Sequence, residues 1–503
     1  MEKHTEQEII RRNSLEKIKE KGINPYPAEE YIISTNSAEI KSNFSPKETP
    51  PLNISIAGRI MGRRIMGKAS FVEIKDEKGR IQVYVNRDEI CPQEDKTMYN
   101  EVFKKYLDIG DIIGVTGDVF ITKVGEISVK AKTIKILSKS LKPLPIVKID
   151  STGEKHDDFK NTELRYRQRS LDLMVNDDSW KTFEKRTQLI NSIRNILNKQ
   201  GYMEVETPIL QPIAGGAAAR PFITHHNTLD MPLYLRIANE LYLKRLIVGG
   251  KHGVYEFAKD FRNEGMDRTH NPEFTMLEFY VAYKDYKWMM GFIEKMFEKV
   301  AKEVCGETKI KYDNQEIELK GPYKKIAFFD AIQEKTGQNI SNMTNEELTR
   351  YCKSKKIETN SSMGRGKLFD SIFGEFCEKD LIQPTYITDY PVEMSPLTKK
   401  HREKKGLTER FELFINGKEI ANAYSEQNNP IEQRKSFEEQ VKLSEKGDDE
   451  AMLIDNHFLT ALEYGMPPTS GIGIGIDRLT MLLTNKKTIQ DVLFFPQMKP
   501  EKK

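Results

Sequence analysis

The first hydrophobic pattern along the chain is helical. Ile9, Ile10, Leu15 and Ile18 recur at roughly helical spacing between residues 2 and 21, and the sequence GINP follows them. This spacing predicts a short N-terminal helix that ends before the glycine and the proline. Its lysines and arginines are interpreted as a solvated face, with contact to RNA as the alternative.

From residue 53 to residue 138 the pattern changes to short alternating segments. They read ISIAGRI, ASFVEIKD, RIQVYVN, IIGVTGDVF and EISVKAKTIKIL, with turns expected at Lys78-Gly79 and Val124-Gly125. Five such strands predict a small closed antiparallel β-barrel of the OB type over residues 51–145, after an N-terminal helical extension over residues 1–50.

The remainder of the chain has an α+β pattern. The sequence LKPLPIVKID contains two prolines before a polar stretch, so residues 146–160 are predicted to link two domains. Residues 179–200 are predicted to form a helix with one apolar stripe. Strands then alternate with helices, which predicts a second domain over residues 161–503.

Composition narrows the class of protein. The chain has 503 residues with 79 Lys and Arg against 76 Asp and Glu, and the resulting charge of +3 does not by itself indicate a nucleic-acid partner. No apolar run approaches the ~18–20 residues that span a bilayer, and no apolar signal segment opens the sequence. We therefore expect a cytoplasmic protein with no membrane partner. Its four cysteines are far apart, which predicts reduced thiols without a disulfide or a structural zinc.

The segment 254–281 has the densest set of reactive side chains. Two β-rich runs flank a polar loop, which predicts a hairpin with a long connection whose second strand presents alternate residues on one face. The polar and aromatic residues concerned are Arg262, Glu264, Arg268, His270, Phe274, Glu278 and Tyr280. Guanidinium groups suit a carboxylate or a phosphate, so we favour a binding site over the alternative of a solvated hairpin.

Residues 410–426 predict a second hairpin with Asn416-Gly417 at its turn. A two-residue loop would pair position 415 with 418 and position 412 with 421, so that Glu412 and Glu419 share a face as diagonal neighbours. This carboxylate pair favours Mg²⁺ held together with nucleotide phosphates, the alternative being an exposed pair. Three polar residues have the opposite parity and need a bulge near Ala421 to share that face: Asn422, Tyr424 and Glu426.

Glycine and isoleucine alternate in GIGIGIDRL, residues 471–479. The glycines are predicted to form a flat floor where a planar base approaches the backbone, and Arg478 is suited to cover that base or bind its phosphate. The spacing differs from the dinucleotide-binding fingerprint. Upstream, PIAGGAAARPF at 212–222 is predicted to be a movable cover, and Glu240 follows near the start of a helix.

Together these segments resemble the signature motifs of class II aminoacyl-tRNA synthetases, and in particular class II lysyl-tRNA synthetases of the bacterial type. The helix before GYMEVETPIL resembles motif one, FRNEG with THNPEF resembles motif two, and GIGIGIDR resembles motif three. The sequences GGAAARPF, ELYLKRL, EFTMLEFY, EIANAYSE and ALEYGMPPT resemble the lysine-specific context. The resemblance implies an antiparallel sheet flanked by helices for residues 161–503, and a homodimer formed through motif one.

The resemblance also implies the reaction: activation of L-lysine by ATP to lysyl-adenylate and its transfer to the 3′ end of tRNA-Lys, with up to three Mg²⁺ per active site. It implies that ATP is bound by Arg262, Glu264, His270, Phe274, Glu412, Glu419 and Arg478. Of these, Arg262 and Arg478 are the catalytic residues and Glu412 and Glu419 hold the metal. The lysine-binding residues that it implies are Gly216, Glu240, Arg262, Glu278, Tyr280, Asn422 and Glu426.

For the barrel, the resemblance implies that Phe71, Gln82 and Glu126 read the anticodon, with core packing as the alternative for the phenylalanine. Phosphate contacts are expected from Arg59, Arg63, Arg64 and Lys68. The chain departs from the family at Ala218, Asn239 and Phe279 and in the QNN that follows Glu426. None of these departures removes an expected ligand.

Two rival functions remain from the sequence. A synthetase paralogue that lysylates a protein such as elongation factor P would lack the anticodon barrel, which this chain has. A non-catalytic RNA-binding regulator would have lost active-site residues, and all four of Arg262, Glu412, Glu419 and Arg478 are present.

Overall fold

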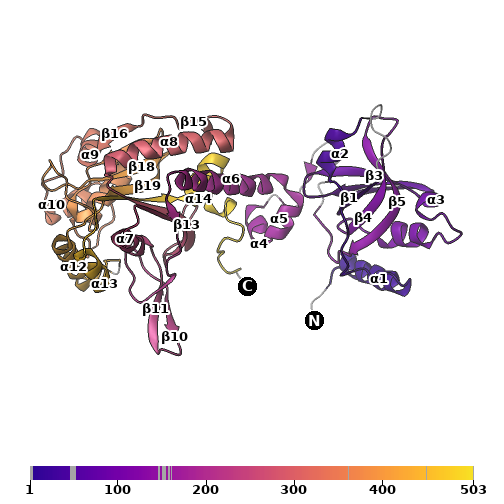
Figure 1. Cartoon of the computed structure of the whole chain (residues 1–503), viewed down its shortest axis with the longest axis horizontal. Coiled ribbons are helices and arrows are strands. Elements are labelled where there is room, and N and C mark those ends of the chain that lie inside the picture. The colour runs from indigo at the N-terminus through magenta and orange to yellow at the C-terminus, as the bar shows by residue number, and fades with distance from the viewer. Residues whose placement is uncertain are drawn as a thin grey trace. The chain divides into compact units, whose positions relative to one another are not determined.

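The chain divides into two units, Met1–Lys160 and Asn161–Lys503, each described here by itself. The computed structural model (Figure 1) describes residues 4–45, 53–145, 148–149, 155–156, 159, 161–360, 362–448 and 450–501. The predicted linker, residues 146–160, falls mostly outside the described residues.

The first unit contains the closed five-stranded barrel that the alternation predicts, in the order β1-β2-β3-β5-β4. Its strands are β1 (Asn53–Met66), β2 (Ala69–Lys75), β3 (Arg80–Asn86), β4 (Ile112–Ile121) and β5 (Ile127–Ser138). Every second residue of β2 and β3 is buried in the barrel core. One expectation was wrong: β3 and β5 pair in parallel, so the barrel is not wholly antiparallel. Local alternation identifies strands but does not determine which distant strand closes the barrel.

Helices cover the barrel and fill the chain between β3 and β4. They are α1 (Glu6–Glu20), α2 (Ser37–Asn43), α3 (Arg87–Ile90) and the π-helix η1 (Met98–Tyr106). The predicted N-terminal helix is confirmed as α1, where Thr5 caps the first turn, Ile18 is buried, and Gly22 follows at a φ of 72°.

The second unit is built on an eight-stranded sheet in the order β16-β17-β18-β19-β20-β13-β12-β8. Its strands are β8 (Met203–Glu204), β12 (Gly253–Phe261), β13 (Glu273–Ala282), β16 (Lys324–Ala327), β17 (Thr385–Thr388), β18 (Arg410–Ile415), β19 (Lys418–Ser425) and β20 (Thr469–Gly475). The central strands are antiparallel, and only the two edge pairs, β8 with β12 and β16 with β17, are parallel. This is the α+β class, with the sheet and flanking helices that the resemblance implies.

Three helices bury one face of this sheet: α6 (Asp177–Lys199), α8 (Tyr286–Cys305) and α14 (Ile476–Thr484). Figure 1 shows α6 and α8 running along that face. The predicted helix over residues 179–200 is therefore confirmed. Ile472, Ile474 and Ile476 point into this core, which leaves the glycines of β20 on the opposite face.

The opposite face is covered only toward its ends. At one end α7 (Glu240–Val248), α12 (Pro430–Glu445) and α13 (Asn456–Glu463) pack over Tyr280 and Ala282. At the other end α9 (Phe328–Thr336), α10 (Asn345–Ser354) and α11 (Arg365–Phe376) pack over Ile387 and Phe414. The middle of this face therefore remains available for a ligand.

The smaller elements connect these parts. They are β6 (Lys148–Ile149), β7 (Lys155–His156), α4 (Thr162–Arg167), α5 (Arg169–Val175), β9 (Leu210–Gln211), β10 (Ile223–His226), β11 (Met231–Leu235), β14 (Lys309–Tyr312), β15 (Gln315–Glu318), η2 (Glu378–Asp380), η3 (Val392–Met394) and η4 (Ile489–Asp491). Among the described residues, the chain forms no helix with the length and apolar character required to cross a bilayer.

Candidate active site

The first hairpin of the site is formed by β12 and β13, joined by the loop 262–272. Met276 pairs with Gly475, Glu278 with Gly473 and Tyr280 with Gly471. Residues directly opposite in a sheet share a face, so these side chains stand over the glycines as the alternation predicts. The glycines have no side chains to separate the ligand from the backbone, and the result is the predicted flat floor.

The second hairpin is formed by β18 and β19. Asn416 and Gly417 have φ values of 50° and 67°, which confirms the tight turn, and Ile415 pairs with Lys418 as predicted. The expected pairing of 412 with 421 was wrong, because Glu412 pairs with Asn422. The shift comes from one extra residue between Glu419 and Ala421, which is the predicted bulge.

This bulge places on one face of the sheet polar side chains that strict alternation along the strand would send to opposite faces. Phe414 pairs with Glu419 and Glu412 pairs with Asn422, so both carboxylates and the amide lie on the glycine side of the sheet. Without the extra residue, Glu419 and Asn422 would point to opposite faces.

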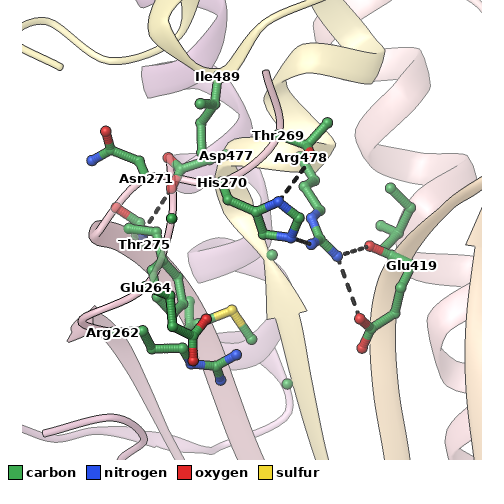
Figure 2. Close-up of a pocket in the computed structure, with 16 residues that line it drawn as sticks. Arg262, Glu264, Thr269, His270, Asn271, Thr275, Glu419, Asp477, Arg478 and Ile489 are labelled. Atoms are coloured by element: carbon green, nitrogen blue, oxygen red, sulfur yellow. Dashed lines mark hydrogen bonds and ion pairs between the residues drawn. The ribbon is translucent and has the colours of Figure 1, made fainter. Parts of the chain in front are cut away.

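A cavity lies over this floor between the loop 262–272 and the start of α14 (Figure 2). Six of the seven expected ATP-binding residues line it: Arg262, Glu264, His270, Phe274, Glu419 and Arg478. Arg262 lies over the ring of Phe274, with 5.1 Å from its guanidinium carbon to the ring centroid. Its Nε atom is buried without a hydrogen-bond partner among the residues described here, so this guanidinium retains a donor for a ligand.

Arg478 connects two sides of the cavity, as Figure 2 shows. Its Nη1 donates to the backbone oxygen of Glu419 at 2.7 Å and approaches that residue's carboxylate at 3.3 Å. Its Nη2 lies 3.2 Å from Nε2 of His270, whose Nδ1 lies 2.8 Å from Asp267. An arginine can only donate, so Nε2 is the acceptor in this contact and Nδ1 faces the Asp267 carboxylate. Hydrogen bonds from Thr269 and His270 outweigh partial burial and hold the pKa of Asp267 well below its usual range.

Glu412 is the one expected ATP and metal residue that does not line the cavity. Arg410 donates to it at 2.6 Å and Tyr390 at 2.7 Å. Burial raises the pKa of Glu412 although Arg410 opposes the shift, and the like charge of Glu419 adds to it. Within the described residues, no three His, Cys, Asp or Glu side chains cluster closely enough to hold a metal. The site therefore offers two carboxylates, and a cation there would need further oxygens from its ligand.

The expected lysine-binding carboxylates form a separate, closed cluster on the same sheet face. Glu278, Tyr280 and Glu426 are 7%, 3% and 2% exposed, and Tyr280 donates to Glu278 at 2.9 Å. Burial, with the charges of Asp260 and Glu240, raises the pKa of Glu278 well above its ordinary value. Of the expected lysine-binding residues only Arg262 also lines the cavity, and Glu278 lies beside Gly473 of its floor, so the carboxylate cluster adjoins the cavity on the same sheet face.

Glu240 and Gly216 lie together at the start of α7. Glu240 is the first residue of the helix, and a Cβ built on Gly216 would lie 3.1 Å from the Cβ of Ala238 and 3.4 Å from the Cβ of Glu240. Gly216 has a φ of 91°, a left-handed conformation that favours glycine. The loop is therefore locally shaped to pass close to Glu240.

Three groups that the sequence did not single out belong to the site. Lys244, fully buried on α7, forms ion pairs with Glu240 and Glu426. Arg410 links Glu412 to Asn422, to which its Nε donates at 3.1 Å. Asp477 accepts from the backbone of Thr275 at 2.7 Å and pairs with Arg186 of α6 at 2.7 Å. Sequence spacing could have indicated two of them. Lys244 lies four positions after Glu240 on a helix, and Arg410 lies two positions before Glu412 on a strand, so each shares a face with a predicted site residue.

Two of the departures from the family, Asn239 and Phe279, are accommodated by their immediate neighbours. Asn239 is buried and donates to Glu256 at 2.8 Å, and Phe279 is buried against Phe292 with 5.7 Å between ring centroids. Both side chains thus fill space in or beneath the sheet.

The expected anticodon residues lie on the barrel of the first unit. Phe71 and Gln82 are on the outward faces of β2 and β3, alternating with buried core residues, which argues against the core alternative for Phe71. Phe71 and Tyr84 lie 5.3 Å apart between ring centroids, and Glu126 is exposed in the β4–β5 turn. Among the expected phosphate contacts, Arg59 donates to the backbone oxygen of Gly110 and Arg63 to that of Leu107, so both guanidinium groups also hold the barrel.

Comparison with known proteins agrees with both units. Residues 161–499 match the family of class II tRNA synthetases (D, K and N), and residues 54–137 match the OB-fold nucleic acid binding domain. A lysine–tRNA ligase of Porphyromonas gingivalis is 62% identical over 99% of this chain and 86% of its own length. One from Christiangramia forsetii is 61% identical over 100% and 88%, and one from Azobacteroides pseudotrichonymphae is 59% identical over 99% of each chain.

Proposed function

The chain belongs to the class II tRNA synthetases of the aspartate, lysine and asparagine group, and we propose that it activates L-lysine with ATP and transfers the lysyl group to tRNA. It is an aminoacyl-tRNA ligase of protein synthesis. The observation that carries the choice of lysine is the closed cluster of Glu240, Glu278, Tyr280 and Glu426. A buried ammonium is costly unless it is paired, and a neutral amino acid would leave unbalanced the carboxylate charge that Lys244, paired with Glu240 and Glu426, does not offset.

The cavity lined by Arg262 and Arg478 is suited to adenylate formation. A carboxylate oxygen of lysine attacks the α-phosphorus of ATP, the bond to the bridging oxygen of the β-phosphate breaks, and pyrophosphate leaves. The two guanidinium groups neutralise charge that develops on the phosphates, and His270 with Asp267 orients Arg478. A ribose hydroxyl of the tRNA 3′ end then attacks the lysyl carbonyl carbon, and AMP leaves. Neither step requires a nucleophilic residue of the protein.

Magnesium is the proposed cofactor, held by Glu412 and Glu419. Two carboxylates on one sheet face are the hard oxygen donors that this ion prefers, with nucleotide phosphates completing its ligands. When bound, the ion neutralises phosphate charge. Arg410 and Tyr390, which donate to one oxygen each of Glu412, fix the position of this carboxylate.

The barrel is proposed to bind the anticodon of tRNA-Lys through Phe71, Gln82 and Glu126, since an outward aromatic ring can stack a base while an amide and a carboxylate read base edges. A homodimer through motif one is supported by exposed apolar side chains on α6, β8 and the following segment: Trp180, Met203, Ile209 and Leu210. A cytoplasmic location is proposed because charged tRNA is consumed by translation.

The test is amino-acid-dependent exchange of pyrophosphate into ATP with each of the twenty amino acids and magnesium. A signal with lysine alone is expected. A signal with another amino acid would retain the class and overturn the lysine pocket, while silence with all twenty would favour a non-catalytic RNA-binding protein.

A further inference from the structure

A lysine of the chain itself occupies the carboxylate cluster. Lys244 lies one turn into α7 and is 0% exposed, and its ammonium forms ion pairs with Glu240 on its own helix and with Glu426 beyond β19. Rings of Tyr424 and Phe458 flank it, with 5.5 Å and 5.9 Å from Nζ to their centroids. A lysine side chain normally keeps its ammonium in water, so the complete burial of Lys244 between two carboxylates is a specific feature of this site.

The groups around Lys244 come from every element packed against it. Tyr424 donates to Oε1 of Glu240 at 2.6 Å, and Tyr280 donates to Glu278. Oε1 of Glu426 lies against Gly471, whose backbone N–H lowers the pKa of this carboxyl. Each of the two paired carboxylates thus gives one oxygen to Lys244, and Glu426 turns the other toward Gly471.

The charges in this cluster do not balance within the protein. Glu240 and Glu426 share the ammonium of Lys244, whereas Glu278 has no ion-pair partner within the described residues. Like charges in a buried site cannot all remain ionised, and a carboxylate that gains a proton loses its attraction for a cation. One internal cation therefore offsets part of the carboxylate charge and still leaves a deficit of positive charge that a substrate ammonium can fill.

We propose that Lys244 is a specificity-determining positioning residue: a built-in counter-ion that pairs with Glu240 and Glu426 and aims them so that the cluster accepts the ε-ammonium of lysine. It touches no substrate atom and acts through these two carboxylates. This inference rests on the proposed function and deepens it, because it explains how three buried acids form a receptor for one ammonium.

The pKa shifts of Lys244 and Glu426 show how each acts on the other. Burial disfavours the ammonium of Lys244, but Glu240 and Glu426 outweigh it and raise the pKa of Lys244 above its ordinary value. Burial raises the pKa of Glu426 well above its ordinary value, and Lys244 opposes this rise without cancelling it. Removing the ammonium therefore moves Glu426 toward its protonated form at neutral pH.

The test compares Lys244→Met and Lys244→Gln with Lys251→Met, a control at an exposed lysine just beyond α7. Pyrophosphate exchange is measured against lysine at saturating ATP and against ATP at saturating lysine. Loss of one partner of a buried ion pair is expected to raise KM for lysine by at least about 30-fold in both Lys244 variants, while KM for ATP changes less than about threefold. The control should match the parent enzyme.

The pH dependence separates a charge role from a packing role. In Lys244→Met the KM for lysine should fall as pH rises from 6.5 to 8.5, because an uncompensated Glu426 must lose its proton to bind the ammonium. In a Lys244→Ala variant, whose short side chain leaves space for an added amine, ethylammonium should partly restore lysine affinity, and neutral propanol should not.

Three results would overturn the inference. They are an unchanged lysine KM in both variants, an equal loss for lysine and ATP without rescue by ethylammonium, or a flat pH profile. If Lys244→Met does not fold, Lys244→Gln decides by the same criteria, since its amide keeps a donor and similar volume. If the parent enzyme shows no exchange with lysine, the proposed function itself fails, whereas an active parent with unaffected variants refutes the role of Lys244 alone.

Discussion

Gly471→Ala should damage lysine recognition far more than nucleotide binding. A Cβ at this position would lie 2.1 Å from Oε1 of Glu426 and 2.3 Å from Cε1 of Tyr280. Real Cβ atoms do not approach other heavy atoms within 3.0 Å, so both groups must move by about an ångström. Neither can move freely, because both side chains are buried beside α7 and β13.

The magnitude follows from that displacement. Overpacking of a buried site typically costs about 1–3 kcal/mol of stability, which leaves a protein of this size folded. A misplacement of about 1 Å in a group that aligns the substrate costs on the order of 100-fold in rate. We therefore expect kcat/KM for lysine to fall about 100-fold in pyrophosphate exchange while KM for ATP changes by a few-fold at most.

Gly475→Ala is the matched control on the same strand. Its Cβ would meet only the side chain of Arg478, at 3.6 Å, which is ordinary contact, and Gly475 lines the nucleotide cavity. This variant should leave KM for lysine unchanged and raise KM for ATP. If Gly471→Ala kept its kcat/KM for lysine within threefold, or if both variants affected lysine and ATP equally, the glycine floor would not divide into a lysine end and a nucleotide end.

Three further outcomes are expected. Glu426→Gln should raise KM for lysine without an equal loss of ATP binding; unchanged lysine dependence in the exchange assay would remove Glu426 from the pocket. Phe71→Ala should weaken tRNA charging and spare adenylate formation, and equal loss in both assays would contradict a separate anticodon role. Asp260→Asn should raise Tm at pH 8: burial raises the pKa of this carboxyl from 3.8 to about 6, against Arg236 and Arg262. The folded state therefore binds the proton more tightly, and stability is lost as pH rises from about 4 to about 6, by at most about 3 kcal/mol. A Tm gain that persisted unchanged at pH 4 would refute this.

Much of the site could be predicted because short-range sequence patterns determine its geometry. Asn416-Gly417 specifies a tight hairpin, and alternate glycines in β20 specify one bare face, whatever the rest of the fold does. The bulge beside Ala421 followed from the requirement that Glu419 and Asn422 share a face. The predicted pairing of residue 412 with residue 421 was wrong for the same reason, because it assumed a regular strand without the bulge.

Other features depend on contacts that sequence spacing does not reveal. Lys244 has the spacing of an ordinary surface lysine on an amphipathic helix, and only the meeting of α7 with the segment after β19 buries it. The parallel pairing of β3 with β5 and the π-helix η1 are likewise outcomes of barrel closure rather than of local propensity.

The single extra residue at Ile420 connects the two halves of the chemistry. It places Glu419, the proposed nucleotide-side residue, and Asn422, the proposed lysine-binding residue, on the same face of one strand, with Arg410 joining Asn422 to Glu412. A strand without the bulge would keep only one of these sets facing the glycines. Arg410 contacts one residue from each set, which couples the two sets through one guanidinium. In the proposed reaction, this hairpin would therefore help to hold the lysine carboxylate and the α-phosphate in one geometry.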